Sequence, residues 1–487
     1  MNPNGVFDGA ERKKDSRLMS FSCLRKVTGF QLFTFTFFGT SAILVLLVFW
    51  TSRLLRPALD DYRLGVVADQ GPIGGVWLWW NTWSGDLTQI LANNLFVGIP
   101  LRHLPWSLAS AVPFIAAALS VTALLLGILL VSSRGDTTKR HRLLGSLILF
   151  PVILISWWSY WWITASLSPD ELNAVPLAVG LTMWQNLNSA YIITWALVML
   201  GWILIEARTP SRRPWQVLLY LVIGLLAGFA GPVFALSALI MLSLLAYALW
   251  LRTPEGWKCR LELWLLTAIG IAVGAAVSFT SPGAEARRSQ GTNAQTDEGL
   301  FPRILSDAFP NGIEDWWLSL TTPGAFILFT LFVGLSLVLA LQGWSTSFEY
   351  LTAVGLGLLV FSVVASVVNR VSELFVYPAY WHLAGSRMLI WAAAVVLGVG
   401  FGGWIASFGR NTVAAPFLLF ATAVSFLLAV SSVANMLGQI QARNLQWEVG
   451  PAPWASEAIL DIETGWVRSD WRDLQRLRDA PTRLPPD

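Results

Sequence analysis

The stretch TPGAFILFTLFVGLSLVLAL, residues 322–341, contains no charged side chain. A hydrocarbon layer about 30 Å thick is crossed by about 20 apolar residues in an α-helix, so this stretch predicts a membrane-spanning helix. Similar runs recur along the chain, which is 55% hydrophobic and 13% charged and has a mean hydropathy of +0.60. This composition is too apolar for a soluble domain of the same length. The sequence therefore predicts an all-α, polytopic membrane protein.

We expect about 11 transmembrane helices, because apolar runs of sufficient length occur about that often. They are residues 29–50, 105–132, 143–163, 173–205, 216–230, 233–251, 261–280, 322–341, 349–368, 388–406 and 413–434. The two runs that meet at Gly231-Pro232 are short, and we expect them either to cross incompletely or to break within protein. Glycine pairs with the spacing of close helix packing occur at Gly224 and Gly228 and at Gly398 and Gly402.

These runs divide the chain into an N-terminal segment (1–28), a transmembrane domain (29–434) and a C-terminal tail (435–487). Inside the domain, residues 53–104 carry too many charges to cross lipid, and we expect them to form a helical first outer loop.

Lysine and arginine in short loops set the orientation, because positively charged flanks stay in the cytoplasm. Basic loops at 134–142, 208–213 and 252–260 fall on the same side as the basic N-terminal segment. We therefore expect a multi-pass cell-membrane protein with a cytoplasmic N-terminus and an extracytoplasmic C-terminus. The segments predicted to lie outside are 53–104, 164–172, 281–321, 369–387 and the tail from 435.

Charge and cysteine content exclude other classes of protein. The net charge of +3 is small and the basic residues are dispersed, so nucleic acid is not an expected partner. Cys23 and Cys259 both fall on the predicted cytoplasmic side, where thiols stay reduced, so no disulfide is expected. His103 and His141 have no metal-ligand spacing, and we interpret them as surface residues.

Adjacent carboxylates at Asp60 and Asp61 begin the first outer loop. Two like charges beside a low-dielectric surface repel each other, which raises one pKa toward the range of a general base. A solvated loop end, with the carboxylates paired to Arg56 or Arg63, is the alternative reading.

Arginines on the same predicted side are candidates for phosphate binding, because a guanidinium stays charged and binds phosphate oxygens in pairs. Arg287 and Arg288 follow a predicted turn at Ser281-Pro282-Gly283. Arg387 stands at the start of a later span, after Tyr377-Pro378-Ala379-Tyr380-Trp381-His382. Contact with lipid headgroups is the alternative reading for the arginine pair.

Several motifs occur in one order along the chain. They are Asp60-Asp61-Tyr62, Trp80-Asn81-Thr82-Trp83-Ser84-Gly85, Trp161-Trp162-Ile163-Thr164-Ala165-Ser166, Ser281-Pro282-Gly283 with Arg287, and Arg387. In this order the chain resembles the GT-C superfamily of membrane glycosyltransferases, and the later motifs are similar to its bacterial branch that includes O-antigen glucosylating enzymes. Two features depart from the family pattern: Asp86 follows Gly85 where an arginine is usual, and the span ending at Gly231-Pro232 lacks polar residues.

The resemblance implies transfer of a sugar from a polyprenyl-phosphate donor to a glycan, lipid or protein acceptor outside the cytoplasm, usually with inversion. Asp60 or Asp61 would take the proton of the acceptor hydroxyl, while Arg287, Arg288 and Arg387 would neutralise the leaving phosphate. Membrane lipid is the other expected partner, and the resemblance leaves open whether a divalent metal takes part. Further candidate contacts to donor or acceptor are Tyr62, Trp83, Asp86, Arg102, His103 and His382.

Two other classes of function stay open. One is a transporter or flippase of lipid-linked saccharide, although such carriers commonly place charges near mid-membrane, and the spans here are nearly free of charge. The other is a non-catalytic protein of envelope assembly that keeps the fold without the activity.

Overall fold

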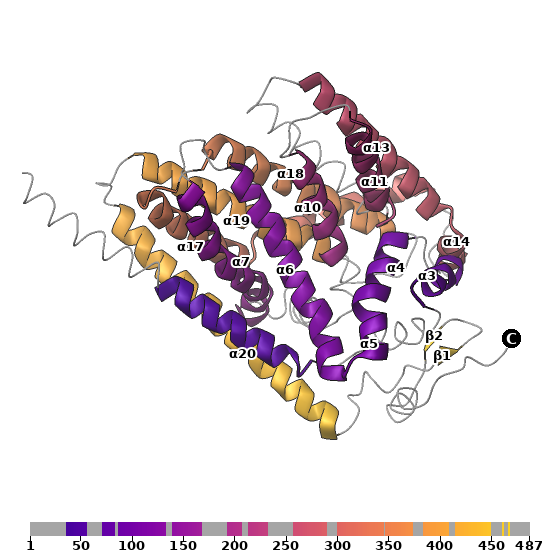
Figure 1. The fold of residues 1–487 in the computed structure, drawn as a ribbon, viewed down its shortest axis with the longest axis horizontal. Helices are drawn as coiled ribbons and strands as arrows, with labels where there is room; N and C mark the ends of the chain where they lie inside the picture. The colour runs from indigo at the N-terminus through magenta and orange to yellow at the C-terminus, as the bar shows by residue number, and fades with distance from the viewer. Residues whose placement is uncertain are drawn as a thin grey trace, which may run out of the picture.

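The computed structural model describes residues 36–55, 71–82, 86–132, 139–167, 192–206, 213–231, 257–289, 300–344, 346–373, 383–408, 414–449, 460–461 and 466–467. Within these ranges the chain is helical except for one short pair of strands (Figure 1). Seven of the described helices are long and apolar enough to cross a membrane. The coarse prediction of an all-α, multi-pass membrane protein is therefore confirmed, while the total of about 11 spans stays a prediction.

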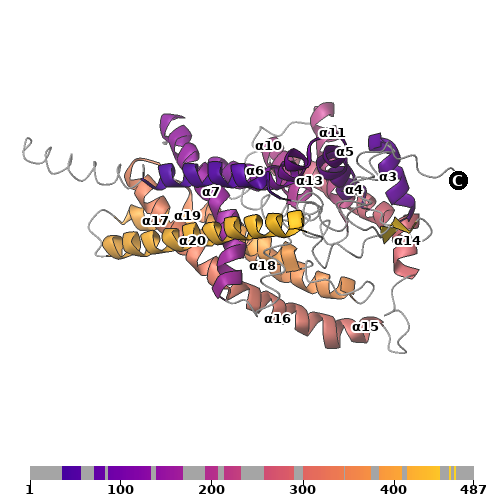
Figure 2. The same ribbon diagram turned by 90° about the horizontal axis from the view of Figure 1, so that it is seen from below.

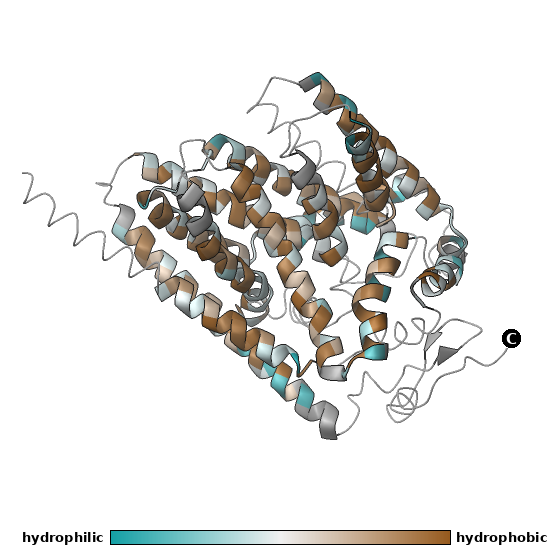
Figure 3. Ribbon diagram, viewed as in Figure 1, coloured by the Kyte–Doolittle hydropathy of each residue, from teal (hydrophilic) through white to brown (hydrophobic). Residues whose placement is uncertain are grey.

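The seven long helices are α6 (Trp106–Ser132), α7 (Lys139–Leu167), α13 (Trp257–Phe279), α17 (Pro323–Leu341), α18 (Phe348–Glu373), α19 (Leu383–Ser407) and α20 (Ala414–Val449). Figure 3 shows hydrophobic residues along these helices and hydrophilic residues gathered toward their ends. Shorter apolar helices are Thr36–Ser52, Leu87–Leu101 and α11 (Pro214–Gly228), and α10 (Thr194–Glu206) is a further short helix. Each long helix lies over a span that the sequence predicted.

The remaining elements are short. The first outer loop contains α3 (Gly71–Thr82), α4 (Leu87–Asn93), the π-helix η2 (Asn94–Gly98) and α5 (Ile99–His103), so its described part is helical as predicted. Between α13 and α17 lie α14 (Pro282–Ser289), α15 (Leu300–Arg303), the π-helix η5 (Ile304–Ala308) and α16 (Phe309–Leu320). In the tail, β1 (Leu460–Asp461) pairs antiparallel with β2 (Trp466–Val467).

One predicted boundary differs from the structure, and two predicted spans are not fully described. The last helix does not end near 434 but continues to Val449, so the segment that we assigned to the tail begins as part of α20. The predicted span 173–205 is described only from residue 192 onward, and the predicted span 233–251 lies outside the described residues.

α7 forms the centre of the bundle, since nearly every residue of its apolar stretch is buried. Its indole rings pack in the interior: Trp157 meets Trp161 and Trp391 edge to face, and Trp158 stacks on Phe114 of α6. α20 and the helix Thr36–Ser52 run side by side along one flank (Figure 1), where Phe37 stacks on Phe426. α7 thus has protein on all sides, whereas α20 and α13 expose large apolar side chains.

Glycines set the closest helix contacts. Gly224 and Gly228 of α11 lie against the Thr267 and Ile271 carbonyl oxygens of α13, where a side chain would overlap the backbone. Gly398 and Gly402 of α19 lie in the same way against the backbone of α17. The prediction that both glycine pairs serve close packing is confirmed.

The bundle has two distinct ends. At one end, the Ser347 backbone N–H donates to the Ser132 carbonyl at 2.9 Å, which joins the end of α6 to the start of α18. At the opposite end, Asn435 of α20 donates to Ser166 of α7 at 3.1 Å, and the arginines of α18 and α19 meet α16. We call this second end the site end. It corresponds to the side predicted to face outward, and its orientation in a membrane stays a prediction.

The glycine contact between α11 and α13 can be tested with Gly228→Ala. The added methyl group would overlap the Ile271 carbonyl oxygen, so we expect a destabilisation on the order of 1–3 kcal/mol. Gly438→Ala in α20 is the control, because nothing lies within 4 Å of its added carbon. Thermal melting of the detergent-solubilised variants should separate them, and equal melting temperatures would contradict the proposed close contact.

Candidate functional site

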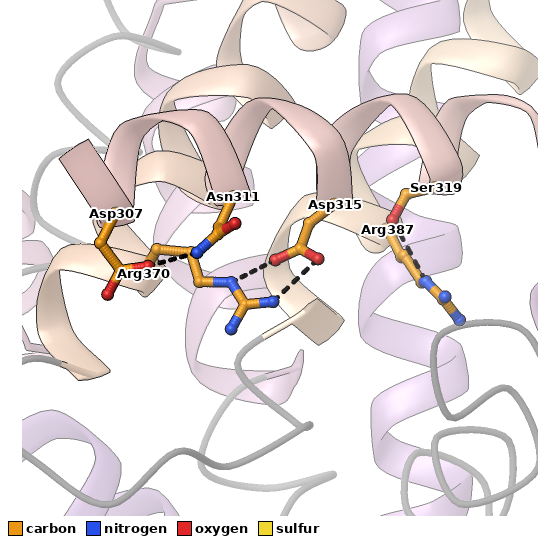
Figure 4. Close-up of polar contacts among 6 residues, drawn as sticks. All are labelled: Asp307, Asn311, Asp315, Ser319, Arg370 and Arg387. Atoms are coloured by element: carbon orange, nitrogen blue, oxygen red, sulfur yellow. Dashed lines mark hydrogen bonds and ion pairs between the residues drawn. The ribbon is translucent and has the colours of Figure 1, made fainter. Parts of the chain in front are cut away.

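Four polar side chains lie along one side of η5 and α16 at the site end. Asp307, Asn311, Asp315 and Ser319 follow one another at intervals of four residues, which places them on one face of a helix (Figure 4). The Asn311 side-chain amide donates to the Asp307 carboxylate. We call this face of α16 the polar row. It is directed toward the start of α19 and the end of α18, from which two arginines reach it.

Arg370 of α18 forms an ion pair with Asp315 in the polar row. Its Nε lies 2.5 Å from Asp315 Oδ2 and its Nη2 lies 2.9 Å from Oδ1, so the contact uses two parallel hydrogen bonds. Asp315 is buried, and about a third of the Arg370 side chain is exposed. Gly312 also lies against the Val367 backbone of α18. This ion pair therefore holds α16 against α18.

Arg387 lies in the second turn of α19 and is only 2% exposed. Its Nε donates to Ser319 Oγ at 3.3 Å, and its guanidinium extends away from α16 (Figure 4). A buried guanidinium is costly unless an anion or several acceptors surround it. It also stands near a helix N-terminus, which carries partial positive charge of its own. Both effects favour a negatively charged group at this place.

Tyr160 of α7 brings a further donor to the same place. The side chain is 1% exposed, and its hydroxyl interacts electrostatically with Arg387. Thr322 lies next to this hydroxyl, but the geometry does not make a hydrogen bond, and within the described residues the Tyr160 oxygen has no partner. A buried hydroxyl normally finds a partner, so this hydroxyl keeps a hydrogen-bonding capacity that the described residues do not use.

The site therefore combines a cation of α19 and an unpartnered hydroxyl of α7 with the hydroxyls of Ser319 in α16 and of Thr322 directly before α17. Arg387 can neutralise an anion, and Arg387, Tyr160 and Ser319 can donate hydrogen bonds to its oxygens, whereas the Thr322 hydroxyl already donates to the Ser319 carbonyl at 2.9 Å. Arg370 pairs with Asp315 and is about a third exposed, whereas Arg387 is almost completely buried beside Tyr160. Such a set suits a phosphate or a carboxylate.

A second polar contact ties the first outer loop to the bundle. Asp86, directly before α4, accepts a hydrogen bond of 3.1 Å from Ser278 of α13. Its carboxylate also lies over Gly231, which has a φ of +102° and follows the end of α11. Asp86 thus has a structural role.

Residues after Asp86 bond the free carbonyls at the end of α11. The Thr88 backbone N–H donates to the Phe229 carbonyl at 3.1 Å, and the Thr88 hydroxyl donates to the Leu226 carbonyl at 2.7 Å. The Gln89 side-chain amide donates to the Ala230 carbonyl at 2.5 Å. The described end of α11 is therefore bonded by protein groups, while Pro232 and the run 233–251 lie outside the described residues, so the expected outcome for the pair of runs stays a prediction.

The segment Ser281-Pro282-Gly283 differs from the prediction. We expected a turn there, but these residues begin α14: Ser281 Oγ accepts from the Ala284 N–H at 3.1 Å, and Pro282 is the first helical residue. Serine is favoured at the N-cap of a helix, and proline is favoured at the first helical position because it has no N–H to leave unbonded. The residues that predict a turn are therefore also residues that begin a helix.

The predicted site residues are only partly covered by the structure. Arg387 and Asp86 lie in the contacts above, and His103 ends α5 with its side chain exposed. Arg287 and Arg288 belong to α14, which lies beside α3 (Figures 1 and 2). Arg102 belongs to α5. The structure does not describe the side chains of these three arginines. Asp60, Asp61, Tyr62, Trp83 and His382 lie outside the described residues.

Sequence reasoning missed Tyr160, Asp315, Ser319, Thr322 and Arg370. The interval of four residues from Asp307 to Ser319 was a signal that could have identified the polar row. Tyr160 gave no such signal, because it lies in an aromatic run typical of a buried helix. In the part of the chain that the structure describes, no group of three or more His, Cys, Asp or Glu residues could hold a metal ion.

Comparison with known proteins gives no relative: no protein-family model matches the sequence, and neither a curated protein nor a solved structure matches it.

The Asp86 contact can be tested with Gly231→Ala. The substitution would strain a backbone at positive φ and crowd Asp86 Oδ1, which would lie 3.1 Å from the added carbon. We expect a loss on the order of 1–3 kcal/mol. Gly71→Ala is the matched control, because its φ is +74° but nothing lies within 4 Å of the added carbon. Equal losses of thermal stability would show that Asp86 does not constrain Gly231.

The ion pair can be tested with Asp315→Asn, Arg370→Gln and the double variant. Each single change leaves one charged partner, so we expect a loss on the order of 1–3 kcal/mol, and a smaller loss in the double variant than the sum. Glu314→Gln is the control, since Glu314 is exposed on the same helix. Additive losses in thermal melting would contradict an energetic coupling between Asp315 and Arg370.

Proposed function

We propose that this protein is a membrane glycosyltransferase that moves a sugar from a polyprenyl-phosphate donor to an acceptor of the cell envelope. The observation that carries the proposal is the buried guanidinium of Arg387 beside the unpartnered hydroxyl of Tyr160, at one end of an apolar helix bundle. A lipid-linked phosphate has both a negative charge and an apolar tail, which match the buried arginine and the apolar helices around it. Its charge suits the arginine, and its prenyl tail suits the surrounding membrane.

In the proposed reaction, Asp60 or Asp61 removes the proton of the acceptor hydroxyl. The acceptor oxygen then forms a bond to the anomeric carbon of the sugar, and the bond between that carbon and the phosphate oxygen breaks. The polyprenyl phosphate leaves with the electron pair of the broken bond. Arg387 and Tyr160 would stabilise the charge that develops on the phosphate, and Arg287 and Arg288 remain further candidates for this role.

A lipid-linked saccharide transporter is the second candidate, and one observation bears on it. α11 ends near Gly231, and broken helices often bind substrates or coupling ions in transporters. Here, however, Thr88 and Gln89 already donate to the carbonyls at that helix end. This arrangement favours a fixed structural break over an ion site, and therefore the transferase over the transporter.

The proposal is tested by transfer from radiolabelled polyprenyl-phosphate sugars to endogenous acceptors in membranes. Asp60→Asn or Asp61→Asn should lower transfer by roughly 10²- to 10⁴-fold, because a general base is lost. Donor binding to the purified protein should persist in the same variant. Wild-type transfer in both variants would refute the assignment of the base.

The phosphate site is tested in the same assay with two substitutions. Arg387→Gln should lower transfer on the order of 10²-fold and weaken donor binding. Tyr160→Phe should lower transfer by roughly 2- to 10-fold without loss of thermal stability, because its hydroxyl makes no hydrogen bond in the described structure.

Arg53→Gln is the control for the loss of an arginine, since Arg53 is exposed and stacks on Trp50. Unchanged donor binding in Arg387→Gln would remove Arg387 from the phosphate site. No transfer from any donor by a folded wild type, with movement of lipid-linked saccharide across vesicles, would favour the transporter instead. Absence of both activities would favour a protein of envelope assembly.

A further inference from the structure

Apolar side chains form a second row along η5 and α16, opposite the polar row. Leu305 is 55% exposed, Phe309 is 50% exposed and Trp317 is 57% exposed. Together with the partly buried Ile313 they recur at intervals of four residues, so they lie on one face. We call this face the apolar row. Three large apolar side chains aligned on an exposed surface indicate a contact that the described residues do not supply.

The rotation of α16 about its axis is fixed by contacts on its other face. Asp315 pairs with Arg370, Ser319 accepts from Arg387, and the Trp316 indole N–H donates to Ser362 of α18 at 2.8 Å. Because these contacts bind the polar row to α18 and α19, the apolar row cannot turn inward. Its exposure is therefore a property of the folded protein.

We propose that η5 and α16 lie in the plane of the membrane surface, with the apolar row inserted at the boundary between lipid headgroups and acyl chains. α16 has 12 residues and is therefore about 18 Å long, too short to cross a hydrocarbon layer of about 30 Å. An amphipathic helix of this kind binds along an interface.

Two further observations identify lipid as the occupant of this face. α16 is followed after Thr321 and Thr322 by the span α17, on which Phe326 is also exposed. In Figure 2, α16 lies at the margin of the bundle beside α18, where lipid would reach it. Trp317, at the end of α16 nearer to α17, is a residue type enriched at membrane interfaces.

This arrangement links the membrane surface to the arginines. The apolar row seats α16 in lipid, while the polar row of the same helix holds Arg370 and supplies Ser319 to Arg387. The bilayer would thereby set the depth of the Arg387 site relative to the headgroups. The inference concerns the placement of α16 and does not require that the protein transfers sugars.

The placement is tested with single cysteines at positions 309 and 317 of the full chain, in a background with Cys23→Ser and Cys259→Ser. Each cysteine carries an environment-sensitive fluorophore, and the protein is reconstituted into phosphatidylcholine and phosphatidylglycerol vesicles. Position 314 is the matched control, because Glu314 is exposed on the same helix outside the apolar row.

We expect blue-shifted emission at 309 and 317, with stronger quenching by lipids spin-labelled near the glycerol than by lipids labelled deep in the chain. Position 314 should give water-like emission. Water-like emission at 309 and 317, or stronger quenching by the deep label, would refute the interfacial placement. Shielding that rises with the protein-to-lipid ratio would show that a second copy covers the face, and would also refute it.

A second measurement needs no substitution. A phospholipid with a photoactivatable group near its glycerol should label the wild-type segment from Leu305 to Trp317, as located by mass spectrometry. A phospholipid with the group at the end of its acyl chain should label that segment at least severalfold less and should label the middle of α17. Equal labelling of Leu305 to Trp317 by both lipids would refute the proposal.

Discussion

Hydrocarbon offers no hydrogen-bond partner to a backbone carbonyl, so each carbonyl at a helix end within the bundle must be bonded by the protein itself. The end of α11 shows how the chain meets this requirement. Leu226, Phe229 and Ala230 would each present a carbonyl to lipid, and Thr88 and Gln89 donate to all three. The first outer loop therefore supplies the hydrogen-bond donors that the end of α11 lacks, and these hydrogen bonds hold the loop against the bundle.

The same requirement explains where polar side chains occur. Within the spans, Ser120, Thr122 and Thr164 each donate to a carbonyl of the preceding turn, which satisfies the hydroxyl inside its own helix. Other polar groups reach across helices, both within the spans, where Ser336 donates to the Val399 carbonyl, and at the site end, where Arg370 bonds Asp315 and Arg387 bonds Ser319. Polar contacts between helices specify which helices are neighbours, so these pairs fix the position of α16 as well as the chemistry of the site.

The position of the buried Arg387 bears on the choice between a transporter and a transferase. Arg387 stands near the start of α19, beside the end of α7 and the start of α17, and not in the middle of a span. A carrier that moves its substrate through the bilayer would use charge near the midplane. A transferase needs its charge at the membrane surface, where the phosphate of a lipid donor stands. The position of Arg387 is therefore the one that the proposed transferase requires.

The sequence alone determined that this chain crosses membranes, where most of its helices lie and that its paired glycines pack helices, since hydropathy and residue size are local properties. Only the tertiary structure decided that Tyr160, Ser319 and Arg387 meet, or that Asp86 bonds Ser278. The reason is that a span such as α17 is apolar on every side. Its sequence therefore does not predict which face packs against protein or which helix lies next to it. Cross-helix contacts then depend on glycine packing and on a few buried polar pairs, whose partners lie far apart in the sequence.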